Sequence, residues 1–328
     1  MIRRINYIHI IMRSLISLRR GNGLASRDKA ERSISSGRST TDFAMFESSI
    51  DSRDVTIVIP TLNEEQAIDL VIQDVILQGY ENVLVIDGNS TDKTPEIVNN
   101  HPVKLVTQKG KGKTGAIKTA IENVHTPYFV LLDGDCSYSA RDIGYLLQNY
   151  SNVDEVIGAR TQGRENISDL NRLGNWALNK AFNMVFGTKL TDVCSGMYLL
   201  KTSFSKSLNL DTEGFDVEVE IASQAAYRDS INEVPIGFYP RVGMQKLHPF
   251  RDGFKILLRI LRMGLKLYPL RVLNLLTMLL IVPGALLIGF PVSYSPQFQS
   301  FFIGIIFITL AIQGVTLYIV DTKMKRNS

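Results

Sequence analysis

The chain has 328 residues and a mass of 36.7 kDa, which is enough for one or two domains with a sizeable core. Hydrophobic residues make up 45% of it and charged residues 21%, which excludes a wholly disordered or collagen-like chain. Residues 1–53 hold ten Lys/Arg and five Asp/Glu, which leaves 26 basic and 27 acidic residues in the remainder. Because the remainder is nearly neutral, we expect no nucleic-acid partner. Two cysteines cannot build a disulfide framework or a four-cysteine zinc site.

Residues 1–53 are predicted to form a disordered basic extension. Arginines interrupt every apolar run of residues 1–20, so no run is long enough for the core of a signal peptide. Residues 21–54 are rich in Ser, Arg and Gly, a composition typical of disorder. Two alternatives stay open: a basic helix over 1–20 that lies on a membrane surface, and translation that begins at Met45.

Residues 54–250 are predicted to form an α/β catalytic domain. Short β-branched or apolar runs predict strands, and amphipathic runs between them predict helices. The strands are expected at 55–59, 83–86, 104–106 and 128–132, and the helices at 64–77, from about 94, and at 114–123. This alternation predicts a mostly parallel sheet with helices on both faces.

Polar residues follow three of these strands at the point where each strand ends. Residues 60–64 follow the first strand, Asp87 follows the second, and Asp133 follows the fourth. Any one of these turns could serve only as a local cap or turn. Because ligands of open α/β sheets bind beyond the carboxyl ends of the strands, the set together predicts a site for a nucleotide-sized ligand.

Two carboxylates stand two residues apart directly after the fourth predicted strand. Asp133 and Asp135 would repel each other unless a cation lay between them, and carboxylate oxygens suit Mg²⁺ or Mn²⁺. The glycine-rich residues 109–115 precede a predicted helix and offer backbone N–H groups and ammonium charges to an anion. They lack the spacing of a Walker A loop.

The C-terminal region is predicted to enter a membrane. Residues 272–290 and 300–320 are charge-free stretches of 19 and 21 residues, each long enough to span about 30 Å of hydrocarbon. Residues 291–299 contain no Lys or Arg, whereas basic residues flank the pair at 255–271 and 322–328. The positive-inside rule therefore predicts a two-helix hairpin in the cell membrane, with the catalytic domain and both termini in the cytoplasm.

Residues 251–271 are predicted to form an amphipathic helix at the membrane interface. Lys255, Arg259, Arg262 and Lys266 share one face of such a helix. Its other face carries apolar residues, Ile256, Leu257, Ile260, Leu261 and Leu265. A helix of this kind suits the lipid headgroup layer, and the alternative is ordinary packing on the domain.

Five ordered segments resemble the inverting glycosyltransferases of family 2, which have the GT-A fold. They are IPTLNEE at 59–65, VIDGNSTDKT at 85–94, DGD at 133–135, TDVCSG at 191–196 and YPRVGMQKL at 239–247. KGKTGAIKTA at 111–120, DVCSGM at 192–197 and GFDVEVE at 214–220 make the resemblance closest to archaeal dolichyl-phosphate hexosyltransferases. These enzymes charge the lipid for protein N-glycosylation.

The resemblance implies a role for individual residues. For the donor, a UDP- or GDP-hexose, it implies binding by Pro60, Asn63, Glu64, Asp87, Asp92, Lys113 and Asp133. For the metal it implies Asp133 and Asp135. For the phosphate of the acceptor, dolichyl or polyprenyl phosphate, it implies Arg160, Arg172, Ser195, Arg241 and Lys246. The residues expected to take part in catalysis are Asp135, Asp192 and Arg241.

The expected reaction is metal-dependent, inverting transfer of a hexose, with glucose favoured. A phosphate monoester has a second pKa near about 6, so the acceptor is already a nucleophile at neutral pH. If a base is needed, Asp192 is the candidate; otherwise it orients an Arg or the backbone. Alternative functions are mannose transfer from GDP-mannose, polysaccharide synthesis, nucleotidyl transfer, and an inactive membrane scaffold of the same fold.

Overall fold

The computed structural model describes residues 50–212, 214–244, 248–278, 301–310 and 312–316. Its strands are β1 (Val55–Thr61), β2 (Val83–Asp87), β3 (Lys104–Thr107), β4 (Tyr128–Leu131), β5 (Glu155–Gln162), β6 (Tyr198–Lys201) and β7 (Ile231–Gly237). Its labelled α-helices are α3 (Ile68–Leu77), α4 (Thr94–Asn99), α5 (Gly112–Asn123), α6 (Ile143–Gln148), α7 (Asp169–Phe186), α8 (Thr202–Ser205), α9 (Val217–Tyr227) and α10 (Pro249–Leu267).

The seven strands form one sheet in the order β3-β2-β1-β4-β6-β5-β7. Strands β1 to β4 pair in parallel, as does β5 with β7, whereas β6 runs antiparallel to both of its neighbours. The predicted mostly parallel sheet is therefore confirmed. Because β1, β2 and β4 run in the same direction, the segments that follow them meet at one edge of the sheet.

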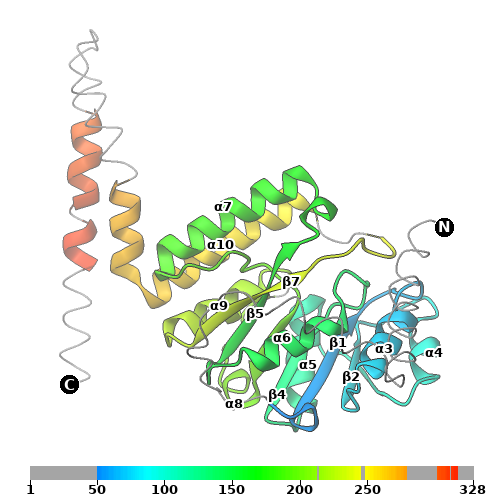
Figure 1. The fold of residues 1–328 in the computed structure, drawn as a ribbon. Helices are drawn as coiled ribbons and strands as arrows, with labels where there is room; N and C mark the ends of the chain where they lie inside the picture. Colours follow the sequence, from blue (N-terminus) through cyan, green and yellow to red (C-terminus); the bar gives the residue numbers. More distant parts are fainter. Residues whose placement is uncertain (1–49, 213, 245–247, 279–300, 311, 317–328) are drawn as a thin grey trace, which may run out of the picture.

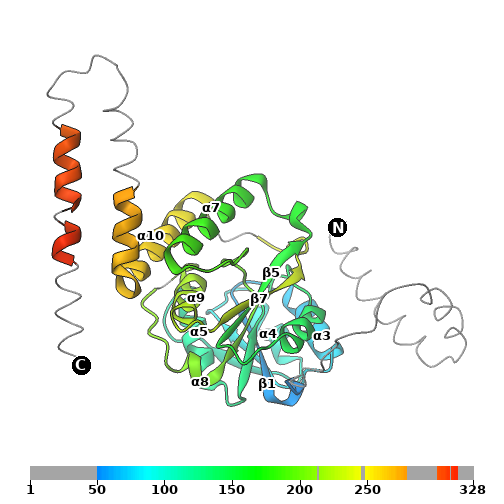
Figure 2. The ribbon, with the colours of Figure 1, turned by 60° about the vertical axis from the view of Figure 1, so that its left-hand side comes forward.

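Alternating side chains of the strands pack under helices on both faces of the sheet (Figure 1). In β1, Ile57 and Ile59 belong to the core under α3, α4 and α6, while Val58 belongs to the core under α5 and α9. Helices α7 and α10 add a further layer on α9, and both views show them side by side (Figures 1 and 2).

The first helix begins later than the sequence pattern predicted. We expected it over 64–77, but α3 begins at Ile68. The backbone N–H of Glu64 donates to Thr94 Oγ1 and that of Glu65 donates to Asp92 Oδ2. These bonds hold residues 64–67 to the loop after β2, and Asn63 takes a left-handed conformation with φ 50°. A contact distant in sequence thus overrides the local helical pattern.

Helix α10 corresponds to the predicted amphipathic helix, and its inner face packs on the domain. Ile256, Ile260 and Met263 are buried against α7 and α9. Arg259, expected on the exposed cationic face, is instead buried in ion pairs with Asp216 and Glu220. Exposed apolar side chains remain on the outer side of α10: Phe250, Phe254, Leu258 and Leu265.

Beyond α10, residues 269–278 are helical, as are 301–310 and 312–316, and these helices lie side by side (Figures 1 and 2). Gln313 Nε2 donates to Asn274 Oδ1 at 3.1 Å and to Thr277 Oγ1 at 2.5 Å, which joins them. Among the residues that the structure describes, no helix is long and apolar enough to cross a membrane. Much of the predicted spans, 272–290 and 300–320, lies outside the described residues, as do residues 1–49 of the predicted extension 1–53. Its last residues are ordered, since 52–54 form a 3-10 turn before β1.

Candidate active site

A cavity of about 410 Å³ opens at the sheet edge where the sequence predicted a ligand site. The segments after β1, β2 and β4 line it, together with the start of α5, the segment before α9, and α10. Its lining includes Pro60, Glu64, Gly88, Lys113, Asp133, Asp135 and Arg241. The cavity is thus built where parallel strands deliver their carboxyl ends to one edge of the sheet.

Lys113 is the buried cation of this cavity. Its ammonium Nζ lies 2.7 Å from Asp133 Oδ1 and 2.6 Å from Glu218 Oε1. Burial disfavours the charged ammonium, but the carboxylates of Asp133 and Glu218 outweigh it and raise the pKa of Lys113 well above its usual value. Burial raises the pKa of Glu218, and Lys113 opposes that rise. Lys113 therefore stays charged at the base of the cavity.

Arg241 is the second cation, and it bridges two carboxylates. Its guanidinium lies 3.0 Å from Glu64 Oε1 and 3.2 Å from Asp135 Oδ2. The Nε atom of Arg241 is buried and has no hydrogen-bond partner among the described residues. Ser137 donates to Asp135 Oδ1 from both its backbone N–H and its hydroxyl, which fixes that carboxylate. An oxyanion in the cavity would find a donor in Arg241.

Asp133 and Asp135 fit a Mg²⁺ or Mn²⁺ ion that also coordinates a substrate diphosphate. Such ions are commonly held by one or two carboxylates, with phosphate oxygens and water completing the shell. Within the described part of the chain no cluster of three or more His, Cys, Asp or Glu could hold a metal by itself. Gly196 packs so closely on Asp133 that a Cβ there would overlap its Oδ2. An ion at this site would therefore take no more than two such ligands from the described residues, and substrate oxygens and water would complete its shell.

A second cavity, of about 510 Å³, adjoins the first. The two share five lining residues, Lys113, Asp133, Asp135, Phe215 and Arg241. The second cavity runs between α7 and the start of α10, where Leu170, Leu173 and Phe250 are exposed. It therefore leads from the paired carboxylates to an apolar surface.

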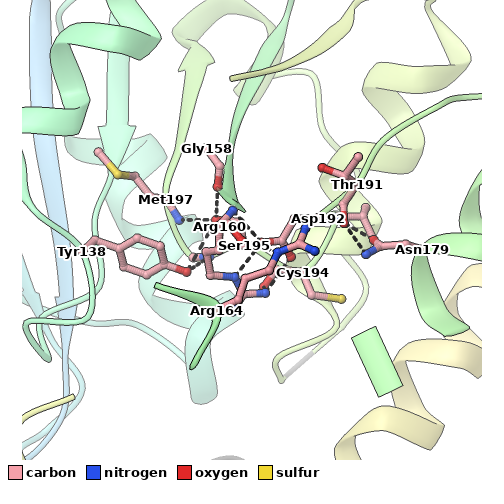
Figure 3. A network of polar contacts seen from close by, with 12 residues as sticks. Tyr138, Gly158, Arg160, Arg164, Asn179, Thr191, Asp192, Cys194, Ser195 and Met197 are labelled. Carbon is pink, nitrogen blue, oxygen red and sulfur yellow. Dashed lines mark hydrogen bonds and ion pairs between the residues drawn. The ribbon is translucent and has the colours of Figure 1, made fainter. Parts of the chain in front are cut away.

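Arg160 and Asp192 form a buried pair beside the second cavity (Figure 3). Arg160 Nε lies 2.6 Å from Asp192 Oδ2, and its Nη2 lies 2.6 Å from Oδ1. Arg160 lines the second cavity, but Asp192 lines neither of the two cavities described so far. Asp192 therefore holds Arg160 in place, which is the alternative to its predicted role as a base.

Ser195 lies under this pair and is 1% exposed. Its hydroxyl donates to the carbonyl of Gly158 at 2.6 Å, and Tyr138 Oη lies 3.5 Å from it (Figure 3). Burial raises the pKa of Tyr138 to about 12. Ser195 thus ties the loop after α7 to β5, and its hydroxyl is already engaged.

Three residues predicted to bind the donor lie behind the first cavity instead of lining it. Asp87 accepts the N–H of Ser90, Asn63 Oδ1 accepts the N–H of Thr91, and Asp92 accepts those of Glu65 and Thr94. These bonds shape the loops that form the cavity wall. Arg172, predicted to bind the acceptor phosphate, pairs instead with Asp169 at the start of α7. Lys246, predicted for the same role, lies outside the described residues.

Glu218, for which the sequence pattern predicted no role, pairs with Lys113 and lines the second cavity. Gln108, Arg251 and Lys255 line the first cavity, although no motif placed them there. A signal for Glu218 was present, because α9 places Glu218 and Glu220 among apolar residues. Acidic residues on a buried helix need buried cations, and Lys113 and Arg259 supply them.

The chain is similar in sequence to a family of known proteins. Residues 56–233 match the family model described as Glycosyl transferase family 2. Glycosyltransferase AglJ of Haloferax volcanii is 37% identical over 215 residues, which cover 63% of this chain and 71% of that protein. A dolichyl-phosphate hexose transferase of the same organism is 32% identical over 208 residues, covering 62% of this chain and 90% of that protein.

Solved structures share the fold. Glucosyl-3-phosphoglycerate synthase of Mycobacterium tuberculosis, solved with Mn²⁺, UDP-glucose and phosphoglyceric acid, has a TM-score of 0.53 and 21% identity. The match covers 64% of this chain and 79% of that one. At this identity the likeness establishes the fold alone, and it confirms the expected GT-A-like α/β architecture.

Proposed function

The chain belongs to glycosyl transferase family 2, and from that premise we propose that it transfers one hexose from a nucleotide-diphosphate sugar to dolichyl or polyprenyl phosphate. Glucose is the sugar we favour. The relative that is named a dolichyl-phosphate hexose transferase supports this acceptor class, since the likeness spans 90% of that protein. The product would be a lipid-linked sugar of the kind used in protein N-glycosylation.

The main support for this proposal is that the two cavities meet at shared lining residues. The cavity at the strand ends suits a nucleotide sugar, because it combines carboxylates with Lys113 and Arg241. The adjoining cavity between α7 and α10 suits a lipid phosphate, because it ends among exposed apolar side chains. Both substrates would meet beside Asp133, Asp135 and Arg241, so that the acceptor phosphate reaches the anomeric carbon directly.

In the proposed reaction, an oxygen of the acceptor phosphate attacks the anomeric carbon while the bond from that carbon to the donor diphosphate breaks. Direct displacement inverts the anomeric configuration and releases the nucleoside diphosphate. The acceptor is dianionic at neutral pH, so no protein base is required. Arg241, which lines both cavities, would orient a phosphate. Lys113 would balance negative charge near Asp133. A Mg²⁺ or Mn²⁺ ion held by Asp133 and Asp135 would neutralise charge on the leaving diphosphate.

We also propose that residues 272–290 and 300–320 anchor the chain in the cell membrane, with the catalytic domain in the cytoplasm. Support comes from their charge-free lengths and the basic residues on both sides of the pair. The exposed apolar side chains of α10, among them Phe250, Phe254 and Leu258, would then face the lipid.

The test is transfer of radiolabelled sugar from a panel of UDP- and GDP-hexoses to dolichyl phosphate in membranes that contain the chain, with and without EDTA. We expect chloroform-soluble label from one UDP-hexose, abolished by EDTA and restored by Mn²⁺ or Mg²⁺. Label from GDP-mannose would select the alternative donor. No lipid-linked label from any donor, from a chain that still binds a nucleotide, would favour the inactive scaffold and overturn the proposal.

A further inference from the structure

A third cavity, of about 510 Å³, lies against a different face of α7 from the acceptor cavity. Arg172, Trp176, Lys180 and Asn183 line it from successive turns of that helix, and residues 188–192 form its other wall. Leu170, Leu173, Gly174 and Leu178 of the same helix line the acceptor cavity instead. The third cavity therefore neighbours the acceptor cavity on another face of α7, and Arg160, Ile167 and Asn175 line both.

This pocket is strongly cationic. Five basic side chains line it, Arg160, Arg164, Arg172, Lys180 and Lys189, and the one carboxylate in its lining is that of Asp192. Arg160 binds both oxygens of Asp192 (Figure 3), and Arg172 pairs with Asp169 beside the pocket. Among the described residues neither Lys180 nor Lys189 takes part in an ion pair. The uncompensated charge, with amides of Asn175 and Asn179 beside it, suits an anion with several acceptor oxygens.

The surroundings of the pocket indicate where this anion comes from. Trp176 stands at its edge and is 59% exposed, and Met184, two turns further along α7, is 58% exposed. Tryptophan beside lysines is typical of the headgroup layer of a membrane. The end of α7 also contacts the helix 269–278, because Arg271 Nη1 donates to the carbonyl of Val185 at 3.2 Å. That helix is the beginning of the first predicted span.

We infer that this pocket binds the phosphate of an anionic membrane phospholipid, at a site separate from the one that receives the acceptor. Lys180 and Lys189 would contact the phosphate, and Trp176 would lie along the acyl chains near the headgroup. Such a lipid would fix the angle of α7, which forms one wall of the acceptor cavity, relative to the bilayer. The site does not depend on the identity of the sugar or of the acceptor.

Trp176 is the only tryptophan of the chain, so its fluorescence reports on this pocket alone. The full chain in a neutral detergent is titrated with dioctanoyl phosphatidylglycerol, with dioctanoyl phosphatidylcholine as the zwitterionic match, and with inorganic pyrophosphate. We expect a saturable change in Trp176 emission with phosphatidylglycerol only, and quenching when the lipid carries bromine on its acyl chains. In Lys180→Gln/Lys189→Gln the apparent affinity should fall about five- to tenfold, since two exposed charge contacts are lost.

The matched control is Lys118→Gln/Lys206→Gln, which removes the same charge from exposed positions in α5 and just after α8, away from α7 and α10, and should leave the titration unchanged. Retention of nucleotide binding shows that each variant is folded. If Lys180→Gln/Lys189→Gln does not fold, the single variants Lys180→Gln and Lys189→Gln are titrated in its place. Equal responses to phosphatidylglycerol and phosphatidylcholine, or equal weakening in the control, would overturn the inference. Saturation by pyrophosphate without a response to the lipid would assign the pocket to a soluble phosphate compound and overturn the lipid as its source. None of these outcomes depends on glycosyl transfer.

Discussion

The ammonium of Lys113 lies 2.6 Å from Glu218 Oε1, in an ion pair whose side chains are 11% and 7% exposed. Lys113 belongs to the start of α5 and Glu218 to α9, so the pair joins two helices that flank the cavities. The same ammonium contacts Asp133, one of the two carboxylates proposed to hold the metal. Glu218 thus holds the Lys113 ammonium beside Asp133.

Replacement of Lys113 by Met should destabilise the fold, because it leaves the buried carboxylate of Glu218 and the partly exposed carboxylate of Asp133 without their cation. Breaking one partner of a buried pair costs about 3–5 kcal/mol, and we expect a loss near the lower end since Asp133 borders a cavity. Lys113→Met/Glu218→Gln should recover part of the loss, because the buried charge of Glu218 is then removed. Thermal or denaturant unfolding of the purified chain measures both effects.

The matched control is Lys109→Met, four residues before Lys113 and in an exposed ion pair with Glu122. Exposed pairs contribute about 0–1 kcal/mol, so this variant should unfold almost as the parent does. If Lys113→Met lowered the free energy of unfolding as little as Lys109→Met does, the buried ion pair would be contradicted. If adding Glu218→Gln to Lys113→Met recovered no stability, the two residues would not be energetically coupled.

Replacement of Asp135 by Asn should abolish turnover and leave the fold intact. The amide keeps the shape and can still accept bonds from Ser137, but it loses the charge that a divalent cation and Arg241 require. We expect transfer to fall by at least about two orders of magnitude. Titration of nucleotide-sugar binding with Mn²⁺, followed by calorimetry, should lose its metal dependence in this variant.

Asp229→Asn is a suitable control for that measurement. Asp229 is an exposed residue after α9 with φ 55°, a conformation that Asn adopts readily. It should change neither turnover nor the melting temperature. An undiminished rate in Asp135→Asn would refute the assignment of the metal to this carboxylate.

The edge of the sheet that carries the site was predicted from the sequence, because the position of each strand along the chain and the residue at which it ends are encoded locally. The strand before Asp133 and the one ending at Asp87 were placed within a residue or two of β4 and β2. The start of α3 was missed because Thr94 and Asp92 capture the N–H groups of Glu64 and Glu65 from 30 and 27 residues away. No local pattern encodes those bonds.

The residues that bind the acceptor phosphate were harder to predict, because their grouping also depends on contacts between residues far apart in the sequence. Arg160, Arg172 and Arg241 were grouped as ligands of one phosphate, yet Arg172 lines the pocket on another face of α7 and Arg160 is fixed by Asp192. Which face of a helix meets which cavity depends on how α7 packs on α9 and α10. Only the tertiary structure separates these arginines.

Replacement of Asp192 by Asn tests whether this residue acts as a base or positions Arg160. The structure favours positioning, because both carboxylate oxygens accept bonds from Arg160. We expect the KM for dolichyl phosphate to rise about tenfold, since a charge-assisted bidentate bond is lost, with the pH–rate profile unchanged in shape. Arg160→Lys should act similarly, and the double variant should be less than additive. Loss of the acidic limb of the profile, with a fall in kcat of about 10²–10⁴, would instead identify a general base.

Glu155 should make the stability of the fold depend on pH. It is 2% exposed at the start of β5, and its Oε2 has no hydrogen-bond partner among the described residues. Burial, with a further contribution from Glu218, raises the pKa of Glu155 well above its ordinary value of 4.5. Between pH 4.5 and the raised pKa, the folded state therefore keeps the carboxyl proton of Glu155, whereas the unfolded state releases it.

Stability from this group is thus fully present below about pH 4.5 and is lost as pH rises toward the folded-state pKa. Glu155→Gln, which has nearly the same volume and no titratable proton, should remove this loss. We expect the variant and the parent to unfold at similar temperatures at pH 4, and the variant to be more stable by about 1–2 kcal/mol at pH 8. Glu122→Gln, a change at an exposed carboxylate, should leave the difference between pH 4 and pH 8 as in the parent. A difference between Glu155→Gln and the parent that did not grow with pH would show that Glu155 is ionised in the folded protein.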